Sequence, residues 1–373
     1  MIIGVPKEIK PCEYRVGMTP YGIKSLCRLG HKVLVQSGAG ESAGFNDDEY
    51  KASGAVISQN AQEVYDNSEM IVKVKEPLPS EYPLMHKNQI LFCYLHLATD
   101  EELTAALLER KVTAIAYETL QTEDGELPLL IPMSEIAGKM SVQIAASLLE
   151  KNKNGKGILL GGVPGVQRGR IVIIGAGYVG VNATKIAVGL GADVSVLDIN
   201  IQKLRKLEDQ FGPSINTYLA TEDNIARLIK KADAVIGAVL LPGAKTPCLI
   251  TEEMVKSMPQ GSVIIDLSIN QGGMVETIDK MTTLDEPYFI KHGVIHYCVD
   301  NLSSAVSRTS TLALTNETSR YIHAISEKGL IGAIKNDSAI GRGVNTFNGK
   351  LTNEAVANSL DVEFTPLTEL IGF

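Results

Sequence analysis

The chain has 373 residues, of which 45% are hydrophobic and 21% charged, with 34 glycines. This composition is typical of a folded α/β protein of two domains, and it excludes a disordered or fibrous chain. The formal net charge is −8 with both signs interspersed, so we expect neither nucleic acid nor an anionic membrane surface as a partner.

The N-terminal segment and the cysteines favour a cytoplasmic protein. The segment MIIGVPKEIK lacks the apolar run of a signal peptide, and no apolar run approaches the roughly 20 residues needed to span a bilayer. The cysteines are odd in number and never spaced as CxxC, which argues against a disulfide framework and a thiolate metal site. They are Cys12, Cys27, Cys93, Cys248 and Cys298. We therefore expect a reducing cytoplasm and no membrane partner.

The first 130 residues alternate between short β-branched runs and segments of helical period. Helices are predicted at 21–29 and 100–110. The predicted strands are IIGV near Ile2, KVLVQ at Lys32, MIVKV at Met70, ILFCYL at Ile90 and VTAIAY at Val112. Such alternation predicts a parallel sheet covered by helices.

A longer helix is predicted over 134–150. Its apolar residues recur at spacings of four, which gives it one buried face and suits a connector between domains. They are Ile136, Met140, Ile144 and Leu148, and the polar, glycine-rich break KNKNGKG follows.

A second series of strands and helices begins after this break. Strands are predicted as RIVIIG at Arg170, DVSVLD at Asp193, DAVIGAV at Asp233 and SVIIDLS at Ser262. Helices are predicted at 179–190, 201–211 and 251–258, with a further helix at 309–327. The last 45 or so residues are less regular, and we expect them to return to the first domain.

Residues Gly175, Gly177 and Gly180 spell GxGxxG between a predicted strand and a predicted helix. The first glycine permits a tight turn, the second lets the backbone approach a pyrophosphate, and the third packs the helix on the strand. The positive end of the helix attracts the pyrophosphate. Asp198 ends the next predicted strand, where a carboxylate can bind both ribose hydroxyls and repel a 2′-phosphate, so NAD is favoured over NADP. Lys203 and Arg205 lie close by and weaken this preference.

These features predict an α/β fold of two Rossmann-like domains with parallel sheets covered by helices. The cofactor domain is inserted between parts of the catalytic domain. We expect the substrate-binding, catalytic domain at 1–130 plus 308–373, and the NAD-binding domain at 131–307.

Polar groups in the first half stand where ligands bind in open α/β sheets. Lys75, His96 and Glu118 end predicted strands, and Arg15 follows the first strand. Arg15 and Lys75 could hold a substrate carboxylate, and His96 could carry protons near neutral pH. The alternatives are solvated surface charges for Arg15 and Lys75, and a hydrogen-bonded structural role for His96.

The other histidines are predicted to be surface or core residues. They are His31, His86, His292, His296 and His323. No cluster of histidine, cysteine and carboxylate side chains has metal-ligand spacing, so we expect no metal.

The whole chain resembles the bacterial alanine dehydrogenase family. The shared motifs are GVPKEIKPCEYRVGMTP, KVKEP, LHLA, YETLQTEDGELPLLIPMSEIAG, GGVPGV, GAGYVG, VLDIN, GAVLLPGAK and RTSTLALTN. The resemblance implies an enzyme that interconverts L-alanine with pyruvate and ammonium using NAD, usually as a hexamer of two-domain subunits.

By this resemblance Arg15 and Lys75 would hold the substrate, and Lys75, His96 and Asn270 would occupy catalytic positions, with His96 as the acid/base. The resemblance and the glycine motif together predict a cofactor-binding set. It comprises Ser134, Gly175, Gly177, Tyr178, Val179, Gly180, Asp198, Lys203, Val239, Leu240, Leu267, Asn270 and Asn301.

The chain also departs from the family pattern. Asn270 stands where the family has a catalytic aspartate, and the family pattern NMPxxVPxTST reads NLSSAVSRTST, with Leu302, Ser303 and Ser307 replacing a methionine and two prolines. Prolines restrict the backbone, so this loop is expected to sample more conformations. Asp300 could supply a carboxylate near the position where Asn270 replaces the family aspartate.

Three functions remain open at this stage. The first is an NAD-dependent alanine dehydrogenase or a close relative acting on another small 2-amino acid. The second is a paralogue that binds NAD but catalyses little, because Asn270 cannot stabilise a developing iminium as a carboxylate can. The third is a reductase for another imine or 2-oxo acid.

Overall fold

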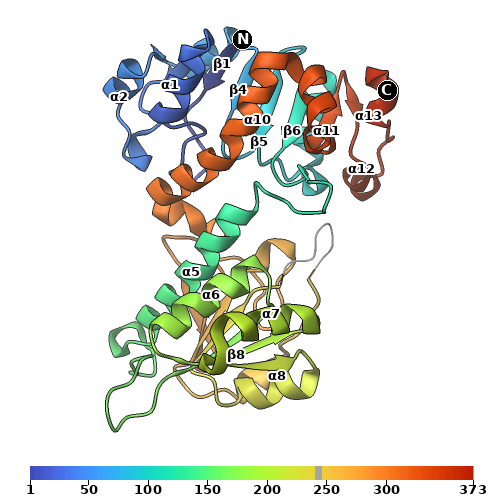
Figure 1. The fold of residues 1–373 in the computed structure, drawn as a ribbon. Helices are drawn as coiled ribbons and strands as arrows, with labels where there is room; N and C mark the ends of the chain where they lie inside the picture. Colours follow the sequence, from blue (N-terminus) through green and yellow to red (C-terminus); the bar gives the residue numbers. More distant parts are fainter. Residues whose placement is uncertain (240–245, 373) are drawn as a thin grey trace. The chain divides into compact units, whose positions relative to one another are not determined.

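In a computed structural model, which describes residues 1–239 and 246–372, the chain divides into two compact units (Figure 1). The first unit joins Met1–Met133 to Ser304–Phe373, and the second unit is Ser134–Ser303. Both chain ends therefore belong to the first unit, and each unit has its own sheet and its own hydrophobic cores.

The first unit is built on an eight-stranded sheet with the order β15-β14-β6-β5-β4-β1-β2-β3. Neighbours among β1 to β6 pair in parallel, whereas β14 pairs antiparallel with β6 and with β15. The strands are β1 (Ile2–Val5), β2 (Lys32–Gln36), β3 (Val56–Ser58), β4 (Met70–Val72), β5 (Ile90–Cys93), β6 (Thr113–Ala116), β14 (Val344–Phe347) and β15 (Lys350–Leu351).

Helices cover this sheet, and local capping explains where several of them begin. The Thr19 side chain accepts a hydrogen bond from the Gly22 amide, and Asn46 and Glu49 form a reciprocal capping box. The helices are α1 (Pro20–Arg28), α2 (Asp47–Ala52), α3 (Ala61–Asp66), α4 (Glu101–Glu109), α10 (Ser307–Asn336), α11 (Ser338–Gly343), α12 (Glu354–Leu360) and α13 (Leu367–Ile371).

The long helix α10 brings the C-terminal segment back to the first unit, and Figure 1 shows it crossing the strands of the sheet. Its residues Leu314, Ile322 and Ile325 are buried in the same core as Ile3 and Val5 of β1. The helix is interrupted at Gly329, which has a φ of 67° that few residues other than glycine adopt readily.

The second unit is built on a seven-stranded sheet with the order β12-β13-β11-β10-β7-β8-β9. All neighbours pair in parallel except β12 and β13, which form an antiparallel edge. The strands are β7 (Arg170–Ile174), β8 (Asp193–Asp198), β9 (Ile215–Leu219), β10 (Ala234–Gly237), β11 (Val263–Asp266), β12 (Tyr288–Lys291) and β13 (Val294–Tyr297).

The helices of the second unit pack closely on its strands and on one another. Helices α5 and α6 lie side by side (Figure 1), because Gly138 has no side chain: an added Cβ would lie 2.2 Å from the Val179 carbonyl oxygen. The helices are α5 (Ile131–Leu148), α6 (Tyr178–Gly189), α7 (Ile201–Phe211), α8 (Glu222–Ile229) and α9 (Glu252–Lys256). None of the described helices is both long and apolar enough to cross a membrane.

Both sheets share one topology, and this topology positions the candidate sites. In each, the chain builds three strands outward in one direction and then continues on the other side of the first, so β1 neighbours β4 and β7 neighbours β10. Ligands bind beside such switch points, at the carboxyl ends of the strands. The predicted α/β fold of two Rossmann-like domains is confirmed, but the antiparallel edge strands β12, β14 and β15 were not predicted.

Candidate functional site

The predicted groups of the first unit follow the carboxyl ends of neighbouring strands. Arg15 follows β1, Lys75 follows β4, His96 follows β5 and Glu118 follows β6. Because parallel strands end at the same edge of a sheet, one edge of this unit carries all four side chains.

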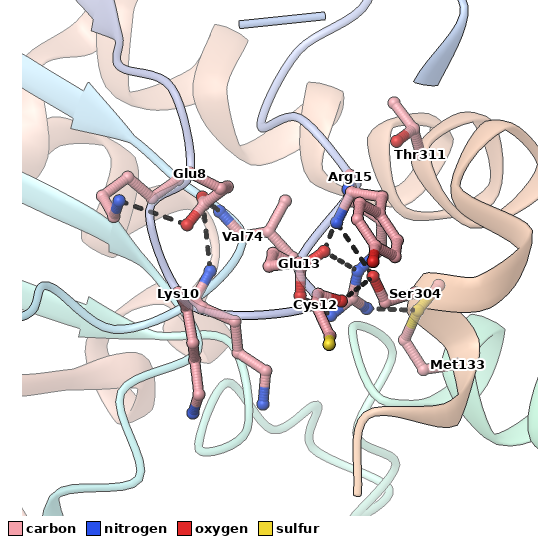
Figure 2. Close-up of polar contacts among 12 residues, drawn as sticks. Glu8, Lys10, Cys12, Glu13, Arg15, Val74, Met133, Ser304 and Thr311 are labelled. Carbon is pink, nitrogen blue, oxygen red and sulfur yellow. Dashed lines mark hydrogen bonds and ion pairs between the residues drawn. The ribbon is translucent and has the colours of Figure 1, made fainter. Parts of the chain in front are cut away.

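Arg15 is buried and is held by a carboxylate that the sequence analysis did not single out. Its Nε donates to Glu13 Oε1 at 2.7 Å, its Nη2 donates to Glu13 Oε2 at 2.6 Å, and its Nη1 lies 3.1 Å from Met133 Sδ (Figure 2). Burial alone would lower the pKa of Arg15, but the hydrogen bonds and charge of Glu13 raise it. Arg15 is therefore a fixed buried cation and not a solvated surface charge.

Lys73 is a second buried cation of this edge, and it was also missed from the sequence. Its Nζ lies 3.2 Å from Glu8 Oε2 and 2.9 Å from Glu81 Oε1. Glu8 Oε1 accepts a hydrogen bond from the Val74 amide at 2.6 Å (Figure 2). Burial raises the pKa of Glu8 although the charge of Lys73 opposes this. The network fixes the backbone after β4, from which Lys75 projects.

Lys75 is buried, and the next residue, Glu76, contacts both Lys10 and His96. Glu76 Oε1 accepts a hydrogen bond from Lys10 Nζ, and Glu76 Oε2 lies 3.4 Å from His96 Nδ1. Burial of Glu76 would raise its pKa, but the hydrogen bond with His96, the charge of Lys75 and the bond with Lys10 together lower it well below its usual value. Glu76 is thus a stable anion beside His96.

His96 is held in an uncommon backbone conformation at the end of β5. Its φ is 53° and its ψ is 32°, in the left-handed region that non-glycine residues rarely adopt. The His96 amide donates to Glu118 Oε1 at 2.6 Å, and the Leu95 amide donates to the same oxygen at 3.1 Å, so Glu118 fixes the turn. The imidazole is half-exposed, and its Nε2 has no hydrogen-bond partner among the described residues. This nitrogen is available to exchange protons with a ligand.

His296, in the second unit, has the surroundings of a structural histidine. Its Nδ1 lies 2.9 Å from the Val294 carbonyl, its Nε2 lies 2.8 Å from Thr277 Oγ1, and its ring stacks on Phe289. Burial lowers the pKa of His296 to about 4. The ring is therefore neutral at neutral pH, and both of its nitrogens are engaged.

The glycine turn of the second unit joins β7 to α6. Gly175 has a φ of 109°, and a Cβ there would lie 2.4 Å from the Ala238 carbonyl oxygen at the end of β10. A Cβ on Gly180 would lie 1.8 Å from the Gly175 carbonyl oxygen. A Cβ on Gly177, by contrast, would meet no atom within 4 Å. Gly175 and Gly180 thus permit close packing, whereas Gly177 faces open space at the N-terminus of α6. This arrangement fits a pyrophosphate.

Asp198 lies at the end of β8 and ties this strand to the glycine turn. Its Oδ2 accepts a hydrogen bond from the Ala176 amide at 2.7 Å, and its Oδ1 accepts one from the Asn200 amide at 2.8 Å. Asn200 also caps α7, accepting from the Gln202 and Lys203 amides, and the Lys203 side chain is exposed. A carboxylate oxygen can accept a second hydrogen bond, so Asp198 keeps capacity for a ribose hydroxyl.

Asn270 lies in a short 3₁₀ turn, Ile269–Gln271, after β11, and its side chain is exposed. Asp266 ends β11 and accepts hydrogen bonds from the Ser268 and Met274 amides, each at 2.8 Å. Burial raises the pKa of Asp266. Ser268 Oγ donates to the Val239 carbonyl at 2.7 Å, which joins the carboxyl ends of β10 and β11.

The remaining predicted cofactor residues also lie in the second unit. Ser134 and Val179 are half-buried on α5 and α6, and Tyr178 is exposed. Leu267 and Asn301 are half-buried, and Asn301 has a φ of 59°. Leu240 lies outside the described residues. Arg15, Lys75 and His96 thus belong to the first unit, whereas Asn270 and the predicted cofactor set belong to the second.

The altered loop contributes one hydrogen bond that a proline could not make, and a neighbouring serine contributes two more. Ser307 Oγ donates to the Ser42 carbonyl at 2.7 Å. Ser304 Oγ donates to the Cys12 carbonyl at 2.6 Å and accepts from the Tyr14 amide at 2.9 Å (Figure 2). Leu302 is buried in the core of the second unit. Ser304 and Ser307 are therefore anchored within the first unit, and the greater conformational freedom of the loop stays a prediction.

Comparisons with known proteins identify the family. The family model described as "Alanine dehydrogenase/PNT, N-terminal domain" matches residues 4–137, and "Alanine dehydrogenase/PNT, C-terminal domain" matches residues 141–354. Alanine dehydrogenase of Methanococcus maripaludis is 55% identical over 372 residues, covering 100% of each chain. Alanine dehydrogenase of Bacillus subtilis is 55% identical over 366 residues, covering 98% of this chain and 96% of that one.

Solved structures agree with these sequence relatives. A structure of an L-alanine dehydrogenase has a TM-score of 0.94 and 45% identity, covering 97% of this chain and 99% of that one. A transhydrogenase from Sinorhizobium meliloti has a TM-score of 0.80 at 24% identity, covering 95% of this chain and 100% of that one, and so shares the fold. The chain belongs to the alanine dehydrogenase/PNT family.

Proposed function

We propose that this protein catalyses the NAD-dependent oxidative deamination of L-alanine to pyruvate and ammonium, and the reverse reductive amination. The observation that carries the proposal is 55% identity to an alanine dehydrogenase over the full length of both chains. The buried cations and the half-exposed histidine at the sheet edge of the first unit support it, because an amino acid offers a carboxylate to bind and protons to move.

The second unit would hold the dinucleotide. Gly175, Gly177 and Gly180 would receive the pyrophosphate at the N-terminus of α6, and Asp198 would accept hydrogen bonds from the adenine ribose. The carboxylate of Asp198 disfavours a 2′-phosphate, which is why NAD and not NADP is proposed. When bound, the nicotinamide supplies the hydride acceptor.

The first unit would hold the amino acid or oxo acid. The guanidinium of Arg15 would pair with the substrate carboxylate, and Lys75 would hold the keto oxygen. His96 would give and take protons at Nε2 during water addition and ammonia loss. The contact between Glu76 and His96 Nδ1 would set the orientation of the ring.

An initial-rate assay with pyruvate, ammonium and NADH tests this proposal. We expect turnover, and we expect His96→Gln to lower kcat by about 10²–10⁴-fold without weakening NADH binding. His323→Gln, on α10 and outside the predicted site, is the control and should keep its activity. Absence of turnover at high enzyme concentration contradicts the proposal.

Asn270 supports a second candidate function. A neutral amide in place of the family aspartate suits a paralogue that binds NAD and turns over slowly, or a reductase for another imine or 2-oxo acid. If the missing charge limits the rate, Asn270→Asp should raise kcat by about 10²–10³-fold. NADH binding by fluorescence with no turnover in either protein favours the binding paralogue. Turnover with other 2-oxo acids or alkylamines favours the reductase.

We also propose a homo-oligomer, by the family resemblance a hexamer, located in the cytoplasm. Light scattering coupled to size-exclusion chromatography tests the assembly. A monomer at micromolar concentration contradicts it.

A further inference from the structure

A groove of about 260 Å³ lies on one face of the second sheet, away from the glycine turn. Arg170 and Asp193, the first residues of β7 and β8, lie at one end of it. The groove is thus at the amino ends of the strands, whereas the dinucleotide turn is at the carboxyl ends. It is lined by Arg170, Ile171, Val172, Asp193, Ser195, Asn216, Tyr218, Arg227, Leu228 and Lys231.

The floor of the groove is polar where a covered sheet would be apolar. Val172, Ser195 and Asn216 are register partners on β7, β8 and β9, so their side chains form one row across the face. Further along β8 on the same face, Leu197 is buried in a core with Ile225 of α8. Val172 is itself buried, so the polar row consists of Ser195 and Asn216, which lie where α8 leaves the face uncovered. This polar row offers a hydroxyl and an amide to a ligand.

The wall of the groove is cationic. Arg227 of α8 stacks 5.2 Å from the ring centroid of Tyr218 and donates to Asn224 Oδ1 at 3.0 Å. Neither Arg227 nor Lys231 has a carboxylate partner within the described parts of the chain. Arg170 Nε lies 3.8 Å from Asp193 Oδ2. Three cations against one carboxylate leave a formal charge of +2 in a chain whose net charge is −8.

We propose that this groove binds a small dianionic oxyanion, such as a phosphate group or a dicarboxylate. A guanidinium presents paired donors that match such oxygens, Lys231 adds a point charge, and the polar row supplies neutral partners. A volume of about 260 Å³ is below the roughly 300–1,000 Å³ of pockets that take drug-sized ligands, which suits a small ion. The site is separate from the proposed dehydrogenase reaction and does not depend on it.

Titration with inorganic phosphate, followed by ³¹P NMR line broadening on the full-length protein, tests the proposal. We expect saturable binding with a dissociation constant on the order of 1 mM. Arg227→Ala and Lys231→Ala should each weaken it about tenfold. Lys230→Ala is the matched control, because Lys230 is an exposed neighbour that does not line the groove, and it should bind as the parent does.

Competition experiments distinguish the possible causes of phosphate binding. Displacement of phosphate by succinate at constant ionic strength supports a site for dianionic oxyanions in general, and resistance to succinate supports a site for phosphate groups. Equal displacement by sodium chloride overturns the proposal, because it indicates counterion condensation. Phosphate binding that survives in both variants overturns it as well, since such binding belongs to the glycine turn. Arg227→Lys, which keeps the charge, guards against misfolding and should bind more tightly than Arg227→Ala.

Discussion

The two units have sheets of similar topology, but the contacts at the carboxyl edges of these sheets differ. At the carboxyl edge of the first sheet, buried side-chain charges hold one another in place, as Arg15 and Glu13 do. At the corresponding edge of the second sheet, Gly175 and Gly180 allow close backbone packing, and the carboxylates accept main-chain amides instead of pairing with cations, as Asp198 does. One topology thus supports a rigid charged edge suited to a small ion and an open backbone turn suited to a phosphate.

The largest predicted effect comes from disrupting the glycine turn of the second unit. Gly180→Ala would place a Cβ 1.8 Å from the Gly175 carbonyl oxygen, and the backbone cannot yield without moving α6. We expect loss of detectable NADH binding by fluorescence and a lower melting temperature. Gly189→Ala, in the same helix, is the control, because its Cβ would meet no atom within 4 Å. It should bind NADH normally and be more stable by about 0.5–1 kcal/mol. Normal NADH binding by Gly180→Ala would contradict this picture.

The next prediction concerns the buried ion pair between Glu13 and Arg15 in the first unit. Glu13→Gln removes the anion of a buried ion pair with Arg15, so the free energy of unfolding should fall by about 3–5 kcal/mol. The exposed pair between Lys51 and Asp48 offers the contrast, since Lys51→Ala should leave the free energy of unfolding nearly unchanged. Urea denaturation measures both values. Equal losses for the two variants would show that the buried pair is not special.

A third prediction concerns how the stability of each unit depends on pH in the acid range. The pKa of His296 is lowered by burial to about 4 from 6.5, so the unfolded chain binds its proton first. Its contribution to stability is complete above pH 6.5 and falls as the pH drops toward 4, by about 3 kcal/mol in all. The lowered pKa of Glu76 affects the first unit only below its usual value of 4.5.

Hydrogen exchange at pH 6.5, 5.5 and 4.5 tests this separation. Between pH 6.5 and 4.5 protection should fall in the second unit. It should hold in the first unit when His31, whose pKa is also lowered by burial, is replaced by His31→Gln. His296→Gln, which cannot titrate, should flatten the dependence. A parallel loss of protection in both units would contradict the assignment to His296.

The smallest predicted effect concerns the altered loop. Ser307→Ala removes the hydrogen bond to the Ser42 carbonyl and should lower the free energy of unfolding by about 1 kcal/mol. Ser359→Ala is the control, because its hydroxyl bonds only to its own helix, at the Ala355 carbonyl. A larger loss at Ser359 than at Ser307 would show that the loop anchor contributes little.

Sequence patterns predicted the fold where the determinants are local. The GxGxxG turn, the strands at Arg170 and Asp193, and the helix over 309–327 all depend on neighbours in the chain. Strands β3 and β9 were missed because they are short or partly exposed, and β14 was missed because Asn345 and Thr346 interrupt its apolar run. The antiparallel direction of β14 depends on how the chain returns after α10, which no local pattern records.

The candidate site shows the same division. Arg15, Lys75 and His96 were found because they follow strands, whereas their partners Glu13, Glu8 and Glu76 were not. These partners are recognised by long-range pairing: Glu8 lies next to Lys73 only after β1 and β4 have paired. One local signal was present, since Lys73 is a charged residue inside the apolar run MIVKV and such a residue requires a buried counter-charge.

The contacts of Asp198 bear on any attempt to change coenzyme preference. Converting an enzyme to NADP usually begins by replacing this acidic residue, yet here its two oxygens each accept a main-chain amide, one of them inside the glycine turn. Asp198→Ser can serve only one of these donors well, and Asp198→Ala neither. Redesign at this position therefore has to restore the hydrogen bonds of the turn as well as change the proposed ribose site.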